Sequence, residues 1–400
     1  GADADKRAHA PTALPAAATT ARSQALAKPS AGERIVFIGN GLAERDVYFS
    51  RLETELHLRY PELNLIVRNM GRPGDTPGFR PHPGRVSQWA FPGAEKFHPD
   101  LNSHFGRGFY PTPDQWLTHL QADTIVAFFG YNESFDGPDK VGNFEAELDA
   151  WVTHTLSKAY NGAAAPRLVL VSPIAFENLS AKRDLPDGKQ ENANLALYSK
   201  AMASVAQKRG LTFVDLFSAT QARLNKKSLA PLTINGFAPT ESGYQELAVL
   251  LADGTFGRQP KASKADPELV HKAVLDKDFF WNNDYNLVNG VHTHGQRYNP
   301  FGPQNYPAEV AKSRQMAAVR DTLIHDLAQG KRRDLTVDDR GTATLPPVPS
   351  NFKPDMKNGN PTEFLSGEAA IAKMKVAPGY KVELFASEEK FPDLKKPVQM

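Results

Sequence analysis

Short apolar runs rich in β-branched residues alternate with segments of helical periodicity between residues 34 and 256. Most of these apolar runs are continuous, which is typical of strands buried on both faces of a parallel sheet. The five strand candidates are residues 34–38, 65–67, 124–129, 167–171 and 211–216. Between them, apolar side chains recur three and four positions apart, as on one face of an amphipathic helix. The helix candidates are residues 49–60, 144–156 and 195–205, and a last helix that opens at Thr240.

This order of elements predicts the fold class. Strands that alternate with helices of this length favour right-handed crossovers between parallel strands. For residues 32–257 we therefore expect an α/β fold, a three-layer α/β/α sandwich around a five-stranded parallel sheet.

Residues 266–330 predict a helical cap. A first helix leads into an aromatic and Asn-rich stretch at 279–286, and a long helix follows from Pro307 to Gln329. We prefer the interpretation that Trp281 and the apolar residues of the long helix pack on the sandwich. The alternative is a saccharide platform, because Trp and Tyr rings stack on sugars while Asn and Asp side chains bind hydroxyls.

The two ends of the chain depart from this pattern. Residues 1–31 are dominated by Ala, Thr and Pro, with too few large apolar side chains to form a core, so we expect a disordered leader. Its composition fits a mature exported protein whose signal has been removed, and it fits an added leader equally well. Residues 331–366 are rich in Pro and Asp and predict an extended linker, after which residues 367–400 begin a further domain.

The amino-acid composition excludes several classes of function. The chain has no Cys, which excludes disulfides, Cys-ligated metals, a thiol nucleophile and CxxCH haem attachment. Its 47 Lys and Arg nearly balance its 45 Asp and Glu, which argues against nucleic-acid binding. No run approaches the roughly 18 consecutive apolar residues of a membrane helix, so no transmembrane segment is expected. The 11 His leave metal and acid–base chemistry open.

Glycine and asparagine are concentrated where the predicted strands end. Functional groups of parallel sheets gather at these carboxyl ends, where the loops of different strands meet. Glycine allows close approach and offers backbone N–H groups, and an Asn side chain can hold an oxyanion. The loops are residues 39–46, 69–76, 130–134 and 233–244.

In this order, the four loops resemble the conserved blocks of the SGNH/GDSL hydrolase family, over about residues 33 to 256. The resemblance implies the SGNH/flavodoxin-like form of the sandwich. It also implies that Gly74 and Asn132 stand at the two oxyanion positions of the family. With the backbone around Asn40 and Gly41, they would form a polar cup able to hold a carbonyl, a carboxylate or a sugar hydroxyl.

The catalytic residues of that family do not match. An acyl-transfer enzyme of this class needs a hydroxyl, an imidazole and a carboxylate. In the alignment, Gly41 stands at the Ser position, Asn235 at the Asp position and Ala238 at the His position. The resemblance therefore implies a degenerate triad, and the catalytic residues, if any, are unknown.

Three stretches, residues 39–45, 128–134 and 171–178, are similar to the SGNH-like domain of very large exported proteins of planctomycetes and verrucomicrobia. In those proteins a propeller resembling sorbosone dehydrogenases and a c-type haem module follow. Residues 375–386 are similar to the opening strand of that propeller. The resemblance implies a periplasmic or cell-envelope protein whose haem lies only downstream, so no cofactor is expected in this chain. The implied partners are the downstream domains, an envelope assembly or a glycan.

Other polar residues near the loops have plainer interpretations. Glu133 and Asp75 could supply acid–base or cation chemistry, but solvated or capping carboxylates are the preferred reading. In the first loop, Glu44 and Arg45 predict a local ion pair. Ser134 and Thr76 are the hydroxyls beside the loops, and neither has a His next to it in sequence. In the same first loop, Asp46 can cap the following helix.

The histidines do not restore a triad. We expect His57 and His154 on the surface. His98 and His104 belong to the insertion at 71–114, which is long for a structureless loop and predicts a lid that could bring a displaced base to the cup. The strand-like i, i+2 spacing of His292 and His294 places both rings on one face, as some metal sites need. No third ligand accompanies this pair, so we expect no metal.

Three hypotheses follow. The preferred one is a pseudo-hydrolase, an SGNH-fold domain of an exported multidomain protein that binds a ligand or docks against its neighbouring domain. The second is an esterase or deacetylase on acylated carbohydrate, with a rearranged catalytic set around Asn132, Gly74 and a lid His. The third is a structural module of an envelope assembly.

Overall fold

The structure is a computed structural model that describes residues 23–101, 108–226, 229–287, 290–299, 302–347 and 365–394. Its chain divides into two compact units, Gly1–Pro346 and Pro347–Met400, each of which is described by itself. Residues 1–22 of the predicted leader, His104, the linker residues 348–364 and the last six residues lie outside the described residues. For residues 23–31 the prediction of a disordered leader was wrong, because this segment is bonded to the sandwich: Leu26 N donates to Thr255 O and Thr212 Oγ1 donates to Gln24 O, both at 2.8 Å.

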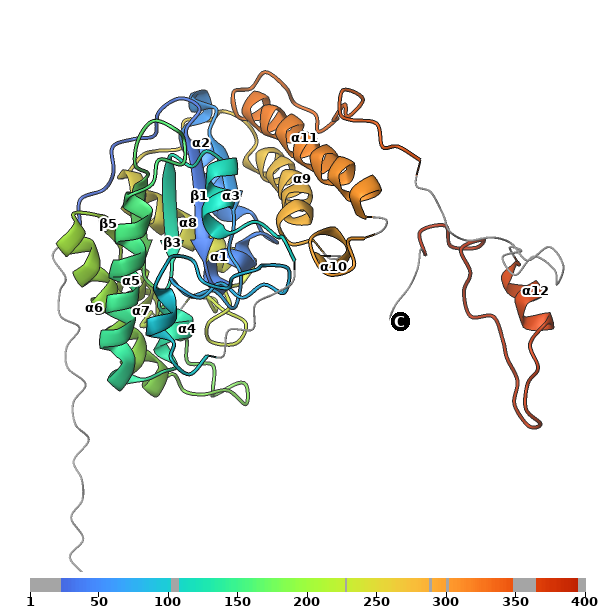
Figure 1. The fold of residues 1–400 in the computed structure, drawn as a ribbon, viewed down its shortest axis with the longest axis horizontal. Helices are drawn as coiled ribbons and strands as arrows, with labels where there is room; N and C mark the ends of the chain where they lie inside the picture. The colour runs from blue at the N-terminus through green and yellow to red at the C-terminus, as the bar shows by residue number, and fades with distance from the viewer. Residues whose placement is uncertain are drawn as a thin grey trace, which may run out of the picture. The chain divides into compact units, whose positions relative to one another are not determined.

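Five parallel strands form one sheet in the order β2-β1-β3-β4-β5 (Figure 1). Their bounds are Arg34–Gly39 for β1, Ile66–Asn69 for β2, Thr124–Phe128 for β3, Arg167–Val171 for β4 and Thr212–Val214 for β5. All five predicted strands are present and the expected fold class is confirmed. In such a sheet, ligands bind where the strand order reverses, which here is the crevice beyond the carboxyl ends of β1 and β3.

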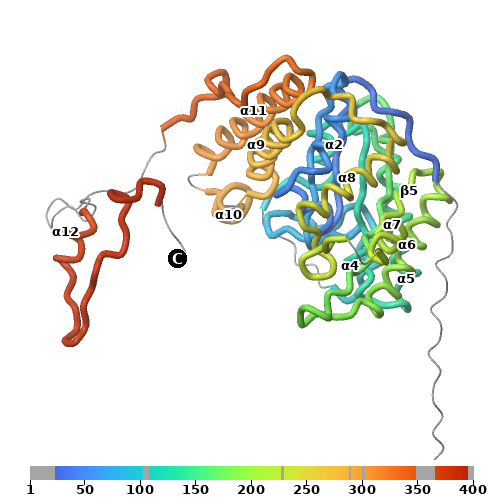
Figure 2. The backbone as a smooth tube through the Cα atoms, turned by 180° about the vertical axis from the view of Figure 1, so that it is seen from behind, coloured from blue at the N-terminus to red at the C-terminus, as the bar shows by residue number. Residues whose placement is uncertain are grey.

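Successive side chains of each strand enter two separate cores. Ile35 and Phe37 of β1 face the core that α2 and α8 cover, whereas Val36 and Ile38 face the core under α3, α5 and α6. Figures 1 and 2 look on these two faces in turn. The bounds of these helices are Arg51–Arg59 for α2, Pro113–His119 for α3, Val141–Leu156 for α5, Lys189–Arg209 for α6 and Glu241–Phe256 for α8.

Two long helices, α9 (Pro267–Tyr285) and α11 (Gly302–Ala328), pack on each other and on α2. Their shared core includes Val270, Ile324 and Leu58, the last from α2.

The aromatic stretch at 279–286, expected to follow the first cap helix, is the last part of α9 itself. Helical spacing turns Trp281 and Tyr285 inward, where the two rings stack and each is only 2% exposed. Neither ring has a free face for a sugar, so the cap interpretation holds over the saccharide platform.

Residues 331–346, expected as part of an extended linker, lie against α11. Arg320 pairs with Asp339 at 2.8 Å, and Lys312 Nζ donates to Thr342 Oγ1 at 2.7 Å. In the second unit, the described residues form the short helix α12 (Gly367–Ala372), and the expected opening strand at 375–386 is not a strand. The remaining helices are α1 (Gly41–Asp46), α4 (Tyr131–Ser134), α7 (Leu216–Leu224) and α10 (Gly290–Thr293), with 3-10 turns at Pro61–Leu63, Ala94–Phe97 and Pro138–Lys140.

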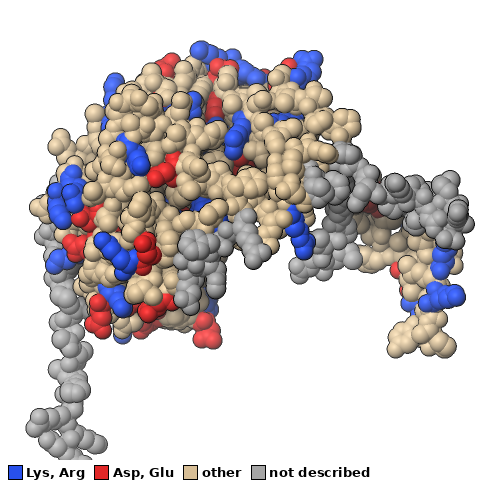
Figure 3. All heavy atoms as spheres, in the orientation of Figure 1, with Lys and Arg blue, Asp and Glu red and all other residues tan. Residues whose placement is uncertain are grey.

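Charged side chains of both signs are interspersed over the face shown in Figure 3, as the near-balanced composition predicts. None of the helices in the described ranges has the length and apolar character needed to cross a membrane.

Candidate functional site

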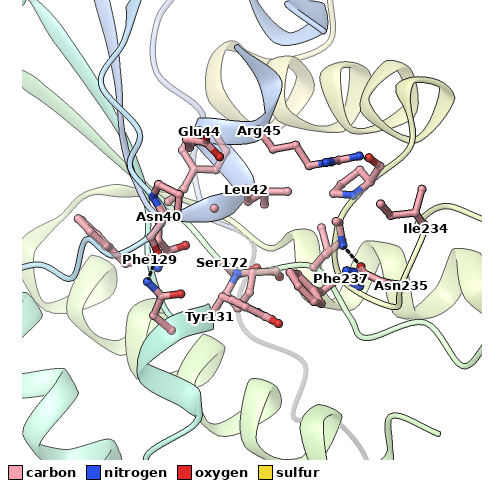
Figure 4. A pocket seen from close by; sticks show the side chains of 18 of the residues that line it. Asn40, Leu42, Glu44, Arg45, Phe129, Tyr131, Ser172, Ile234, Asn235 and Phe237 are labelled. Carbon is pink, nitrogen blue, oxygen red and sulfur yellow. Dashed lines mark hydrogen bonds between the residues drawn. The ribbon is translucent and has the colours of Figure 1, made fainter. Parts of the chain in front are cut away.

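A cavity of about 390 Å³ lies at the carboxyl ends of β1, β3 and β4. Figure 4 shows Leu42, Glu44 and Arg45 of α1 on one side of it and Ile234, Asn235 and Phe237 of the last loop on another, with Asn40 and Phe129 lying beyond α1 from that loop. The structure brings five of the six positions named from the sequence into its lining: Asn40, Gly41, Asn132, Asn235 and Ala238. The sixth, Gly74, is not in the lining, although its neighbour Pro73 is.

The first loop turns at Gly39, which needs to be glycine. Its φ is +122°, and a Cβ there would lie 2.0 Å from Phe128 O of the adjacent strand. Gly41 has no such constraint, because a Cβ there would meet nothing within 4 Å. The position at which the resembling family carries its nucleophile is therefore bare but has room for a side chain.

Glu133 ties the first loop to the third. Its carboxyl accepts hydrogen bonds from Gly130 N and, at 3.1 Å, from Asn40 Nδ2. The residue is 5% exposed, and this burial raises the pKa of the carboxyl to about 8. Contrary to the expectation of a solvated carboxylate, Glu133 is a buried, protonated group at neutral pH that positions Asn40.

Asn132 does not present its amide hydrogens to the cavity. Its Nδ2 donates to Pro73 O at 2.6 Å and to Asp75 O at 3.2 Å, which uses both hydrogens. The free atom of the amide is Oδ1, an acceptor. In this arrangement, Asn132 can receive a hydrogen bond from a ligand but cannot stabilise an oxyanion.

The last loop, residues 233–244, is held by hydrogen bonds to its own Asn235 and to Glu177. Asn235 Oδ1 accepts from Ala238 N at 2.9 Å and Phe237 N at 3.3 Å, as Figure 4 shows for the shorter bond. Glu177 accepts from Leu232 N and Thr233 N, both at 2.9 Å. Asn235 therefore builds a turn where the family has a catalytic Asp. Glu177, which sequence reasoning missed, is signalled only as a carboxylate in an otherwise apolar segment after a buried strand.

Aromatic rings line the cavity at Tyr48, Tyr131 and Phe237, and these too were missed from the sequence. Tyr131 and Phe237 stack with their ring centroids 4.9 Å apart, and Phe135 packs edge-on against Tyr131 at 5.3 Å. Phe135 is 67% and Tyr48 61% exposed. Exposed rings beside a cavity mark a place where an apolar surface can bind.

The hydroxyls near the cavity serve the backbone. Ser172, fully buried in the lining, donates to Pro173 O at 3.0 Å and accepts from Phe217 N at 2.9 Å. Ser134 donates to Tyr131 O at 2.6 Å, and Thr76 donates to Phe79 O at 3.3 Å or to Glu147 Oε1 at 3.2 Å. None of the three is paired with an imidazole among the residues that the structure describes.

No histidine belongs to the described lining of the cavity. His98 bonds Glu147 on α5 at 2.8 Å and does not reach the cavity; of the described residues of the insertion, Pro73 is the one in the cavity lining. His57 and His154, expected on the surface, bond Glu53 at 2.8 Å and Asp114 at 2.7 Å, and His57 is fully buried. The surface expectation was wrong for His57, whereas the side chain of His154 remains 16% exposed.

His292 lies in the helical turn α10 and His294 in the turn that follows it, so the pair is not on a strand. Two residues apart on a helix, the side chains point in different directions. In the described part of the chain, no group of three potential ligands could hold a metal ion.

Arg45 and Glu44 make different contacts from those expected. Arg45 Nε donates to Pro239 O at 2.9 Å and its guanidinium lies over Phe49, so the predicted ion pair with Glu44 is wrong. Arg45 instead joins α1 to the last loop across the cavity. Burial raises the pKa of Glu44 despite its hydrogen bond with Tyr48 and the charge of Arg45.

Asp46 and Asp75 also face inward. Asp46 accepts from Arg51 N at 3.1 Å and Leu52 N at 3.2 Å, so it caps α2 as expected. Asp75 is 2% exposed and 4.0 Å from Arg80, and its burial raises the pKa of the carboxyl to about 6. Neither carboxyl lines the cavity.

Comparison with known proteins shows a similarity of fold and no match in sequence. No family model matches the chain, and no curated protein matches its sequence. Solved structures with a similar arrangement include an alpha/beta hydrolase enzyme from the metagenome of Lake Arreo, Spain, at 19% identity and TM-score 0.39 over 56% of this chain and 95% of that one. They also include an acetylxylan esterase from Geobacillus stearothermophilus at 17% identity and TM-score 0.38, over 56% and 94%. A gut microbial diltiazem-metabolizing enzyme matches at 16% and TM-score 0.41, over 58% and 48%.

Proposed function

We propose that the sandwich is a pseudo-hydrolase that binds a small, mostly apolar, uncharged ligand in the cavity at the strand ends without cleaving it. One observation carries this proposal. In the described lining, the Ser172 hydroxyl and the amides of Asn132 and Asn235 are bonded to loop backbone, the Asn40 amide is bonded to Glu133, and no imidazole is among the lining residues. Acyl transfer needs a hydroxyl and a base in mutual contact.

The lining indicates the chemistry of the ligand. Leu42, Ile174 and Phe129 give apolar walls, and a cavity of about 390 Å³ is within the range of small-molecule sites. Asn132 Oδ1 is an acceptor with no partner among the described residues. A ligand with an apolar body and one amide or hydroxyl donor fits these groups best.

The absence of hydrolysis is tested with p-nitrophenyl esters of increasing acyl length and with fluorophosphonate labelling. We expect neither turnover nor labelling. Ester hydrolysis that Asn132→Ala abolishes would overturn the proposal and would favour an esterase with a rearranged catalytic set.

Binding is tested separately by filling the cavity. Ala238 is 9% exposed and lines the cavity, so an indole at this position occupies the ligand volume. Ala165→Trp, at an exposed position outside the lining, is the matched control. We expect a library of neutral aryl amides and alcohols to raise the melting temperature of the wild type and of the control, and not of Ala238→Trp. Equal increases in melting temperature in all three proteins would show that the ligand binds elsewhere than in this cavity.

The wider context is part of the same proposal. The similarity of residues 39–45, 128–134 and 171–178 to the SGNH-like domain of large exported proteins supports an exported, envelope-associated protein with a propeller and a haem module downstream. Sequencing the gene beyond the codon for Met400 tests this directly. A stop codon there, or a continuation without CxxCH, contradicts it.

A further inference from the structure

A second, smaller cavity of about 180 Å³ lies between the sandwich and the helices α9 and α11. It is at the other end of the sheet from the first cavity, because Arg34 is the first residue of β1 and Asn40 follows the last. Trp281 forms an apolar wall, and most of the remaining lining is ionisable. The groups concerned are Arg34, Arg68, Arg314, His119 and Asp284.

Two of the three arginines are paired. Arg68 donates to both oxygens of Asp321, at 3.0 and 2.6 Å. Arg314 donates to both oxygens of Asp284, at 2.7 and 3.2 Å. Their bidentate geometry uses the carboxylates fully and leaves none for the third arginine.

The guanidinium of Arg34 makes no hydrogen bond or ion pair to any residue that the structure describes. The carboxylate nearest in sequence, Asp123, accepts instead from the backbone N of Arg34 and from Asn161 Nδ2, both at 2.8 Å. Three guanidiniums therefore face two carboxylates around the cavity, and Arg34 holds the uncompensated charge.

The excess of positive charge affects the pKa of His119. Burial lowers the pKa of His119, and the charges of Arg314, Arg34 and Arg68 lower it further, against the opposing effect of Asp284. The three guanidiniums therefore converge on one space. A neutral imidazole beside them supplies a hydrogen-bond donor or acceptor without adding charge.

We propose that this cavity binds a small oxyanion, of the size of phosphate, with Arg34 as its charged contact. Guanidinium groups recognise phosphate and carboxylate oxygens through two parallel N–H bonds. The cavity volume lies below the roughly 300 Å³ at which sites for larger organic ligands begin. Its occupant is thus a free phosphate or the phosphate or carboxylate end of a molecule whose remainder lies in solvent.

Titration calorimetry at low salt with inorganic phosphate, phenyl phosphate and acetate tests the proposal. Arg34→Gln removes the unpaired charge and no contact to a described residue, so we expect it to fold as the wild type does, which circular dichroism checks. Arg258→Gln, an exposed arginine away from the cavity, makes the same charge change and is the control. We expect at least one of the three anions to bind the wild type and Arg258→Gln equally, and to bind Arg34→Gln at least tenfold more weakly.

The anion that binds most tightly shows whether the site takes free phosphate, the phosphate end of a larger molecule or a carboxylate. Arg34→Lys keeps the charge but loses the planar guanidinium that can donate two parallel hydrogen bonds. We therefore expect an anion affinity between those of the wild type and Arg34→Gln. The absence of binding by all three anions at millimolar concentration overturns the proposal. Equal weakening in Arg34→Gln and Arg258→Gln does so as well, because it would show that only net charge matters.

Discussion

Two regions of this molecule bury polar groups in opposite ways. Besides Glu44 and Arg45, the cavity at the strand ends is lined by apolar and neutral polar groups, among them the amides of Asn40, Asn132 and Asn235, and the protonated carboxyl of Glu133 lies behind Asn40. The interface of α2 with α9 is built from charges. Its centre is Lys277, which is fully buried, bonds Glu53, lies 2.8 Å from Asp278 Oδ1 and donates to Val67 O at 2.8 Å.

The difference teaches what each region can do. Ionised groups in a protein interior are stable only when each has its partner, which ties the interface to one docking geometry. Neutral groups tolerate the removal of one hydrogen bond more easily and create little field. The cavity is therefore suited to exchange an uncharged ligand with water, whereas the interface is suited to hold the cap in place.

The largest loss of stability is expected from a substitution in the interface of α2 with α9. Lys277→Met leaves Glu53 and Asp278 buried without their cation, and we expect a loss of about 3–5 kcal/mol in the free energy of unfolding, measured by urea denaturation. Lys208→Met removes an exposed lysine that pairs with Asp149 at 3.3 Å, and we expect a loss of about 0–1 kcal/mol. Similar losses in the two variants would contradict the contrast between a compensated interior and a solvated surface.

The next effect concerns the proton on Glu133. Its pKa is about 8 in the folded protein against 4.5 when unperturbed, so between these values the folded state keeps a proton that the unfolded state has lost. The contribution of Glu133 to stability is complete below about pH 4.5 and decreases as the pH rises towards 8. Glu133→Gln lacks this decrease. Relative to the wild type, it should gain about 2–3 kcal/mol in the free energy of unfolding between pH 5 and pH 7.

Urea denaturation of both proteins at several pH values in that range measures this gain. Parallel stability curves would show that Glu133 is ionised in the folded protein and that a charge, not a neutral carboxyl, positions Asn40.

A smaller effect is expected for the turn at Asn235. Asn235→Ala removes the acceptor of Ala238 N and Phe237 N, and we expect a loss of about 1 kcal/mol and weaker binding of the cavity ligand. Asn161 makes a similar turn away from the cavity, where its Oδ1 accepts from the next backbone N–H groups at 2.9 and 3.0 Å. Asn161→Ala also removes the bond from Asn161 Nδ2 to Asp123 Oδ1 at 2.8 Å, so it should lose at least as much stability and still bind the ligand normally. Weakened binding in both variants would mean that Asn235 acts only through stability.

The smallest effect is expected at Gly41. A Cβ there meets open space, so Gly41→Ala should change the free energy of unfolding by less than about 0.5 kcal/mol. Gly142, in the first turn of α5 and also with open space around a Cβ, is the matched reference, and Gly142→Ala should change the free energy of unfolding equally little. A loss above about 1.5 kcal/mol in Gly41→Ala, in thermal or urea denaturation, would show that the position has to stay bare.

The fold and the place of the cavity could be predicted from the sequence because both follow from local patterns. Continuous apolar runs define strands, and the ends of parallel strands meet at one edge. Asn40, Asn132 and Asn235 were therefore recognised as neighbours although they are far apart in the chain. The direction in which each amide points was not predictable, because Pro73 O and Glu133 decide it by contacts that no spacing reveals.

The burial of His57 was not predictable for a related reason. His57 lies on the polar flank of α2, and a polar flank normally predicts solvent. It is covered because α9, much later in the chain, brings Lys277 to the Glu53 with which His57 pairs. Sequence periodicity reports which side of a helix is apolar, and it does not report which charged partner another helix supplies.

By itself, the sequence determined the α/β sandwich, the carboxyl-end loops and the glycine and alanine at positions where the resembling family carries Ser and His. These follow from residue type and from the geometry of strands and helices. Only the tertiary structure decided that Asn132 offers an acceptor, that Glu133 keeps its proton and that Arg34 is left without a partner. The physical reason is that hydrogen-bond direction, protonation and charge compensation depend on which distant groups share a desolvated space.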